Sequence, residues 1–183
     1  MGTQQGLSES VGSLARLPLL TTKFHIPRVR RNVVRRLGLL NRLDCGRDRR
    51  LTLVSAPAGF GKTTLISEWA EGLMAHSISE DRGTNRIGWL SLDDDDNDYS
   101  RFVSYFVGAL QSIELEDEPA GKIGKEAIEL LALPQPPPPQ EVLTPVLNQI
   151  SALSDRIILV LDDYHFIETK AIHTALAFGM ENM

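Results

Sequence analysis

The 183-residue sequence has little of several things that would otherwise direct its function. It contains one cysteine, Cys45, which excludes an internal disulfide and has no companion Cys or His at a metal-ligand spacing. No apolar run approaches the roughly 18 residues of a membrane span, and the N-terminus lacks the continuous apolar stretch of a signal peptide. These absences predict a cytoplasmic protein that does not contact a membrane.

Charge is unevenly distributed along the chain. The net charge is −5, yet residues 1–50 hold eleven Lys and Arg against three Asp and Glu. Such a basic segment binds nucleic acid, a phosphate-bearing ligand or an acidic surface, or is simply a solvated face. Because no DNA-recognition motif accompanies the charge, we expect any DNA binding by this chain to be weak and salt-dependent.

Hydrophobic periodicity predicts strands that alternate with helices. Short apolar runs rich in β-branched residues predict three buried strands, at 51–55, 87–92 and 157–161. Helical spacing predicts helices over 62–74 and 99–113, one over 33–43 that Gly38 interrupts, one with Thr144 as N-cap and Pro145 at the first position, and one that starts near Thr169. Strands that are apolar throughout predict a parallel sheet covered on both faces, an α/β architecture.

Two segments are predicted to lie outside these elements. Residues 1–20 are polar and weakly patterned, which predicts a flexible leader. Residues 134–139 contain five prolines, which predict an extended connector over 134–141.

The strongest motif reads Ala56-Pro57-Ala58-Gly59-Phe60-Gly61-Lys62-Thr63-Thr64. It follows a predicted strand and opens a predicted helix, which is the context of a P-loop, although Ala56 stands where the usual pattern begins with glycine. Glycines let backbone N–H groups wrap phosphate oxygens, Lys62 can reach the β- and γ-phosphates, and the Thr63 hydroxyl is placed to ligate Mg²⁺. The predicted nucleotide-binding residues of this motif are Pro57, Ala58, Gly59, Phe60, Gly61, Lys62, Thr63 and Thr64.

A second motif is the apolar run 157–161 that ends in Asp162 and Asp163. Asp162 fits the acid that holds Mg²⁺, and Asp163 occupies the position of a residue that polarises the attacking water. Two strand-end acids that only cap the next turn are the alternative. Paired with the P-loop nearly 100 residues upstream, the motif predicts ATP or ADP and Mg²⁺ as cofactors.

An acidic run covers residues 93–98, with five carboxylates in six positions. Calcium binding is one interpretation, but the spacing of an EF-hand loop is missing. Helix capping is the favoured interpretation for Asp96 to Asp98. Asp93, at the end of a predicted strand, is a weaker site candidate.

Several blocks together resemble one family. They are Thr22-Lys23-Phe24, Val33-Val34-Arg35-Arg36, the P-loop motif with Leu65, Trp89-Leu90-Ser91-Leu92-Asp93 and Asp162-Asp163-Tyr164-His165. Over roughly residues 20–183 the sequence resembles the N-terminal NTPase domain of MalT-like regulators, large LuxR-type ATP-binding transcriptional activators of the STAND class. The resemblance implies a P-loop NTPase domain over 21–183: a three-layer α/β/α sandwich with a mainly parallel sheet, C-terminally truncated.

The resemblance also implies a switch that rests with ADP, is released by inducer and ATP, and hydrolyses ATP slowly. Lys62 and Thr63 carry over as phosphate and Mg²⁺ contacts, Asp162 as the Mg²⁺ acid and Asp163 as the catalytic, water-polarising acid. Val34 and Arg36 match the segment beside the adenine. There the family reads Arg-x-Arg-Leu, whereas this sequence reads Arg36-Leu37-Gly38-Leu39 and lacks the second arginine.

The family continues into a further strand with a sensor arginine, a winged-helix region, a helical-repeat sensor and a helix-turn-helix, none of which occurs before Met183. We therefore expect an incomplete domain with little ATP turnover. The implied partners are the nucleotide, other copies in the full-length protein, and DNA only through a C-terminal domain absent here. A stand-alone P-loop ATPase or phosphotransferase, and an interaction module that uses the basic segment, stay open as alternatives.

Overall fold

A computed structural model describes residues 18–30, 32–76, 85–113 and 123–182. The predicted leader, residues 1–20, therefore lies outside the described residues except for its last three positions. The described part is a mixed α/β structure with parallel strands, so the predicted fold class is confirmed at that level. No helix among the described residues is long and apolar enough to cross a membrane.

Two parallel strands form the sheet in the described part of the chain. β1 (Asn85–Ser91) pairs with β2 (Arg156–Asp162) in a register that runs from Asn85 opposite Arg156 to Ser91 opposite Asp162. The predicted strands 87–92 and 157–161 are thus confirmed within one or two residues. Since both strands end at the same edge, the groups that follow Ser91 and Asp162 lie next to each other.

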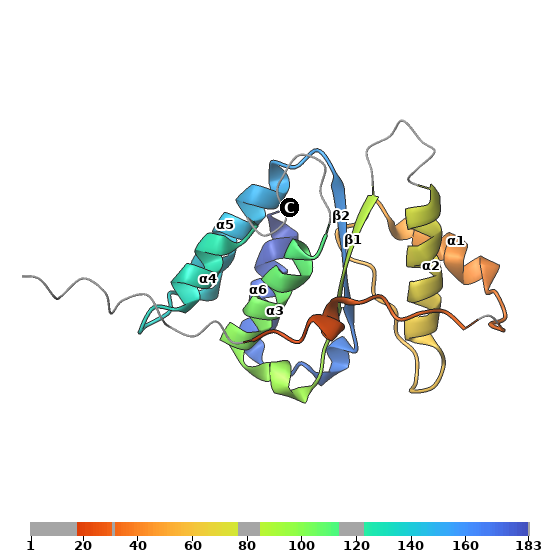
Figure 1. Cartoon of the computed structure of the whole chain (residues 1–183), viewed down its shortest axis with the longest axis horizontal. Coiled ribbons are helices and arrows are strands. Elements are labelled where there is room, and N and C mark those ends of the chain that lie inside the picture. The colour runs from red at the N-terminus through yellow and green to blue at the C-terminus, as the bar shows by residue number, and fades with distance from the viewer. Residues whose placement is uncertain (1–17, 31, 77–84, 114–122, 183) are drawn as a thin grey trace, which may run out of the picture.

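Helices cover both sides of the strand pair (Figure 1). The α-helices are α1 (Leu37–Gly46), α2 (Lys62–His76), α3 (Tyr99–Gln111), α4 (Lys125–Leu131), α5 (Pro139–Ser151) and α6 (Lys170–Glu181). Three short 3₁₀ helices are η1 (Thr21–Phe24), η2 (Asp94–Asn97) and η3 (Tyr164–Phe166). Helices α1 and α2 lie on one side of the strands and α3 to α6 on the other, the arrangement expected of a layered α/β fold.

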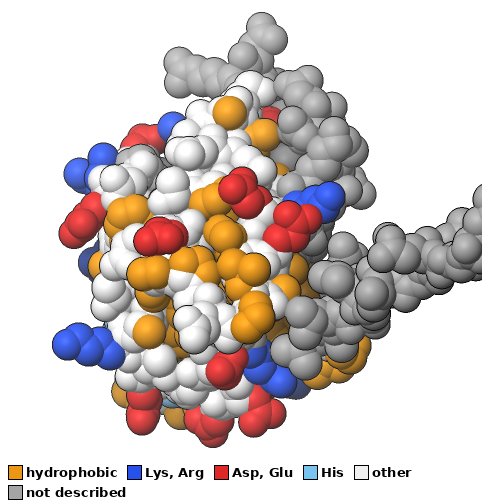
Figure 2. Space-filling model, turned by 90° about the vertical axis from the view of Figure 1, so that its left-hand side faces the viewer, with side chains coloured by type: hydrophobic (Ala, Val, Ile, Leu, Met, Phe, Trp, Pro, Cys, Tyr) orange, Lys and Arg blue, Asp and Glu red, His pale blue; other side chains and the backbone are white. Residues whose placement is uncertain are grey.

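The main core lies between the strands and helices α3 to α6. Its fully buried members include Leu90, Phe102, Val142 and Ile172, one from each of β1, α3, α5 and α6. On the outer side of this layer, over α4 and α5, hydrophobic side chains gather between acidic ones (Figure 2). A smaller cluster of Leu40, Leu43 and Leu65 joins α1 to α2.

The predicted strand at 51–55 is wrong. The structure assigns no strand there, and Leu51 and Leu53 are 61% and 80% exposed. A strand needs a partner, and β1 and β2 pair with each other instead. The apolar, β-branched composition of 51–55 is typical of a strand, but composition does not determine whether another strand lies beside it to form hydrogen bonds.

Two helices begin at other positions than predicted. Helix α5 begins at Pro139, inside the predicted 134–141 connector, and Pro145 lies within it rather than at its first position. Pro139 is as well suited to a first turn as Pro145, because proline lacks the backbone N–H and a first-turn N–H has no partner within the helix. Helix α1 begins at Leu37 and runs through Gly38, which costs about 1 kcal/mol but does not break a helix. The predicted helices 62–74, 99–113 and the one from Thr169 are confirmed as α2, α3 and α6.

Candidate functional site

The glycine-rich loop, residues 56–61, leads directly into helix α2. Gly59 and Gly61 have φ angles of +80° and +74°, a region that favours glycine because it has no Cβ. The Lys62 ammonium turns back over the loop and donates hydrogen bonds to the carbonyls of Ala56 at 2.9 Å and Pro57 at 3.5 Å. The loop therefore holds a cation beside a helix N-terminus, where anions are favoured.

A hydrogen bond links the start of α2 to the end of β2. The Thr63 hydroxyl lies 3.0 Å from Oδ1 of Asp162, across 99 positions of sequence. Lys62 and Thr63 reach this position as the first residues of α2, and Asp162 as the last residue of β2. The two motifs that the sequence separates are thus brought together, and they present a cation, a hydroxyl and a carboxylate at one edge of the sheet.

Burial raises the pKa of Asp162 above the usual 3.8; the Thr63 hydrogen bond opposes this rise, and the neighbouring Asp163 adds to it. A buried carboxylate that gains a cation is the kind of group that a hard metal ion stabilises. No group of three or more His, Cys, Asp and Glu that could hold a metal occurs in the described ranges. Mg²⁺ usually takes one or two protein ligands together with phosphate oxygens, and Thr63 and Asp162 offer two oxygen atoms at this edge of the sheet.

Asp162→Asn is expected to make the ligand-free chain more stable. Folding raises the pKa of this carboxyl, so its ionisation destabilises the folded state; the cost grows as pH rises above 3.8 and is complete at neutral pH. Asparagine removes the charge but keeps an oxygen for the Thr63 hydroxyl. Urea unfolding in EDTA should give a higher midpoint for the variant at neutral pH, and the difference should shrink in acid. The same change at the exposed Asp94, which is not among the causes of the Asp162 shift, serves as control, and a lower midpoint for Asp162→Asn would contradict the assignment.

Asp163 lies in a different environment from its neighbour. Its backbone is left-handed, with φ 56° and ψ 32°, the one positive φ at a non-glycine position in the described part of the chain. Its side chain is partly exposed, and Oδ1 lies 3.7 Å from Nδ1 of His165. Backbone strain of this kind clusters at functional sites. The two acids therefore lie in different environments: the Asp162 side chain is buried and hydrogen-bonded, whereas the Asp163 side chain is partly exposed to solvent.

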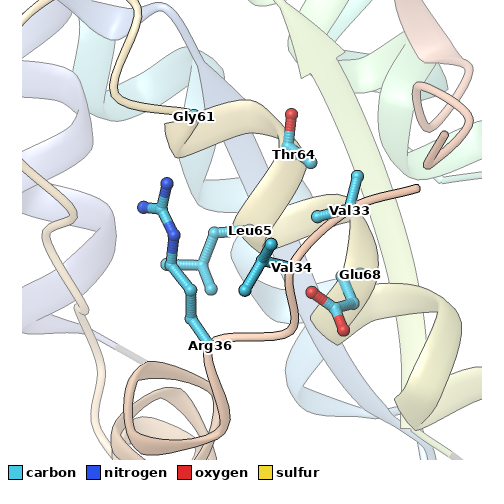
Figure 3. Close-up of a pocket in the computed structure, with 7 residues that line it drawn as sticks. All are labelled: Val33, Val34, Arg36, Gly61, Thr64, Leu65 and Glu68. Carbon is cyan, nitrogen blue, oxygen red and sulfur yellow. The ribbon is translucent and has the colours of Figure 1, made fainter.

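A small pocket adjoins the glycine-rich loop (Figure 3). It is lined by Val33, Val34, Arg36, Gly61, Thr64, Leu65 and Glu68. Val34 and Arg36, which the resemblance implies lie beside the adenine, both line this pocket, and Nη1 of Arg36 donates to the Phe60 carbonyl at 2.9 Å. Of the predicted nucleotide-binding residues of the P-loop motif, Gly61 and Thr64 line this pocket, whereas Pro57, Ala58, Gly59, Phe60, Lys62 and Thr63 do not.

The acidic run after β1 is largely used for capping, as predicted. Asp98 accepts a hydrogen bond from the Arg101 backbone at 2.8 Å and caps α3. Asp93 and Asp96 form a reciprocal capping box around η2. The weaker site candidate Asp93 is in addition held by Lys23, whose ammonium lies 2.8 Å from Oδ2.

Lys23 and Glu68 were missed by the sequence reasoning. Lys23 is buried and pairs with Asp96, which is fully buried and also contacts Arg101 at 3.3 Å. Nothing local marks this pair, since its members are 73 positions apart. Glu68 could have been found, because it lies seven residues after Gly61 and therefore on the same face of α2.

Comparison with known proteins shows the class of protein to which this sequence is similar. No family model matches the chain. The chain is, however, homologous to HTH-type transcriptional regulators over most of its length.

The relatives are named MalT, and the resemblance predicted from the sequence is thereby confirmed. The chain is 32% identical to MalT of Klebsiella pneumoniae over 164 residues, which cover 90% of this chain and 16% of the relative. It is 31% identical to MalT of Cronobacter sakazakii over 164 residues and 35% identical to MalT of Serratia proteamaculans over 167 residues, with the same coverage. The chain thus corresponds to about one sixth of the length of these regulators.

Proposed function

We propose that this chain binds ATP or ADP with Mg²⁺ and acts as a nucleotide-dependent switch domain of a LuxR-type transcriptional regulator of the STAND class. The observation that carries the proposal is the 3.0 Å contact between the Thr63 hydroxyl and Asp162 at the mouth of the glycine-rich loop. In P-loop proteins a Ser or Thr of this loop and a strand-end Asp share the nucleotide's metal ion.

The described residues fit the proposed ligand in charge and in atom type. Thr63 and Asp162 would hold Mg²⁺ through hard oxygen atoms, which this ion prefers. Bound Mg²⁺ neutralises part of the phosphate charge. Lys62 would exchange the carbonyls of Ala56 and Pro57 for phosphate oxygens, which are stronger acceptors.

Asp163 would orient the water that attacks the terminal phosphate. Its carboxylate follows directly after the Mg²⁺ acid and is open to solvent, so a water molecule has access to it. Orientation of a single water supports slow ATP hydrolysis. Slow hydrolysis suits a switch, in which it ends the ATP-bound state, better than a metabolic enzyme. The relatives' name as regulators favours a switch over a stand-alone ATPase or phosphotransferase.

We further propose that the protein is cytoplasmic, self-associates in its ATP state and contacts DNA through a helix-turn-helix domain rather than through the residues described here. The relatives are named as helix-turn-helix (HTH-type) regulators, which supports that assignment of DNA binding.

The proposal is tested by substituting Asp162 and Asp163 one at a time and comparing the effects on ATP binding and hydrolysis. Asp162→Ala should abolish the gain in ATP affinity that Mg²⁺ produces, because the metal loses its protein carboxylate. Asp163→Asn should leave ATP affinity within about twofold, because an exposed group beside the metal contributes little to binding, but should slow hydrolysis in the full-length protein. Titration calorimetry in Mg²⁺ and in EDTA, with phosphate release for hydrolysis, gives both readouts. The same defect in both variants would show that the division of roles is wrong.

A further inference from the structure

One face of helix α2 continues from the glycine-rich loop into the small pocket. Gly61, Thr64, Leu65 and Glu68 follow the i, i+3, i+4, i+7 spacing of a single helical face. At about 1.5 Å per residue, Glu68 lies roughly 10 Å along the helix from Gly61. Val33 and Val34 lie across from this face (Figure 3). The pocket therefore begins where phosphates would bind and ends at a carboxylate.

The pocket has the size and the lining of a subsite. Its volume of about 110 Å³ is below the roughly 300–1,000 Å³ of complete small-molecule sites, so it can take one part of a ligand. Val33, Val34 and Leu65 provide apolar walls, and the Arg36 guanidinium lies over the loop end. Flat heterocycles bind against such apolar and guanidinium surfaces. A base attached to loop-bound phosphates fits this order of groups.

Glu68 is the acidic group of this pocket, and it is held in place. Its side chain is 13% exposed, whereas that of its partner Arg35 is 69% exposed. Nε of Arg35 donates to Oε1 at 2.8 Å. Among the described residues no hydrogen bond is formed to Oε2 of Glu68. Arg35 thus fixes the carboxylate from the solvent side and leaves one oxygen for a ligand.

We infer that Glu68 selects the base of the nucleotide by accepting a hydrogen bond from the 6-amino group of adenine. The inference rests on the proposed nucleotide function. Adenine presents an N–H₂ donor at position 6, whereas guanine and hypoxanthine present a carbonyl oxygen, which a carboxylate repels. Because Oε1 is held by Arg35, the remaining oxygen suits one amino donor better than the paired N1–H and N2–H₂ donors of guanine.

The first measurement compares ligands on the unchanged chain in Mg²⁺. ATP should bind about tenfold tighter than inosine triphosphate, GTP or purine riboside triphosphate, which lacks any group at position 6, because a hydrogen bond to a charged acceptor is lost. Inorganic tripolyphosphate reports on the phosphate site without a base. If the chain binds none of these ligands, the proposed function itself is refuted. Equal affinity for ATP, inosine triphosphate and purine riboside triphosphate would overturn only the role of Glu68.

The second measurement uses matched variants. Glu68→Gln carries an amide that can donate to a 6-carbonyl, so the preference for ATP over inosine triphosphate should fall from about tenfold to about twofold or less. Glu71→Gln makes the same change three residues further along α2, at an exposed position that does not line the pocket, and should keep the preference. Tripolyphosphate affinity should stay the same in both. An unchanged preference in Glu68→Gln would overturn the inference.

Discussion

Replacing Lys62 by alanine should reduce the affinity of the chain for ATP by on the order of 100-fold, since hydrogen bonds to charged groups are the strong ones in such sites. The Lys62 ammonium lies over the glycine-rich loop, within 2.9 Å of the Ala56 carbonyl. It is therefore a cation held beside the loop whose backbone N–H groups would receive phosphate. Without the Lys62 ammonium, the γ-phosphate charge would be stabilised by Mg²⁺ and the loop N–H groups without this cation.

Titration calorimetry with ATP and with ADP measures this effect. The loss should be larger for ATP, because the lysine bridges the β- and γ-phosphates and ADP has no γ-phosphate. Lys170→Ala, at an exposed lysine at the start of α6, should leave both affinities unchanged. Near-normal ATP affinity in Lys62→Ala would show that the loop is not a phosphate site.

The second large effect concerns stability. Lys23→Ala should lower the free energy of unfolding by about 3 kcal/mol, the range for removing one partner of a buried ion pair. Asp96 is fully buried and, among the described residues, would retain only Arg101 as a counter-charge, 3.3 Å away. The variant also loses the contact of the ammonium with the Tyr105 ring, 4.7 Å from its centroid.

Urea unfolding at neutral pH tests this expectation. Burial acts against the charged form of Lys23, but the hydrogen bonds to Asp93 and Asp96 outweigh it, so the pKa of Lys23 lies above 10.5. Because folding raises the pKa of Lys23, its charge stabilises the folded state, and this stabilisation is complete below pH 10.5 and is lost only at higher pH. Neutral buffer therefore shows the whole effect. Lys125→Ala breaks an exposed pair with Glu129 and should cost under about 0.5 kcal/mol. A loss below about 1 kcal/mol in Lys23→Ala would contradict the importance of the buried pair.

The parts of the fold that the sequence predicted well are those with local causes. The glycine-rich loop needs positive φ at two nearby glycines, and both are found. Strand β2 is an apolar run with a definite end at Asp162, and α3 has an aspartate N-cap at Asp98. Each of these signals lies within a few residues of the structure it causes.

The parts that could not be predicted depend on partners distant in sequence. The run 51–55 has a strand's composition but no paired neighbour. Lys23 is one of five lysines in the sequence, and its burial depends on Asp96, which is 73 positions away. Helix α4 has only seven residues and follows a left-handed Gly124, so it offers too few turns for a periodic pattern. Pro145 shows that tertiary packing of an amphipathic helix can absorb a residue that ordinarily ends one.

The left-handed backbone at Asp163 bears on attempts to engineer a sturdier version of this chain. A protocol that optimises stability alone would place glycine at 163, relieving about 1 kcal/mol of steric cost, and would favour a neutral residue at 162. Both choices improve the fold and delete the two carboxylates that follow the strand. Consensus or computational redesign should therefore keep Asp162 and Asp163 unchanged, because a substitution here that raises the melting temperature would also remove a carboxylate from the proposed nucleotide site.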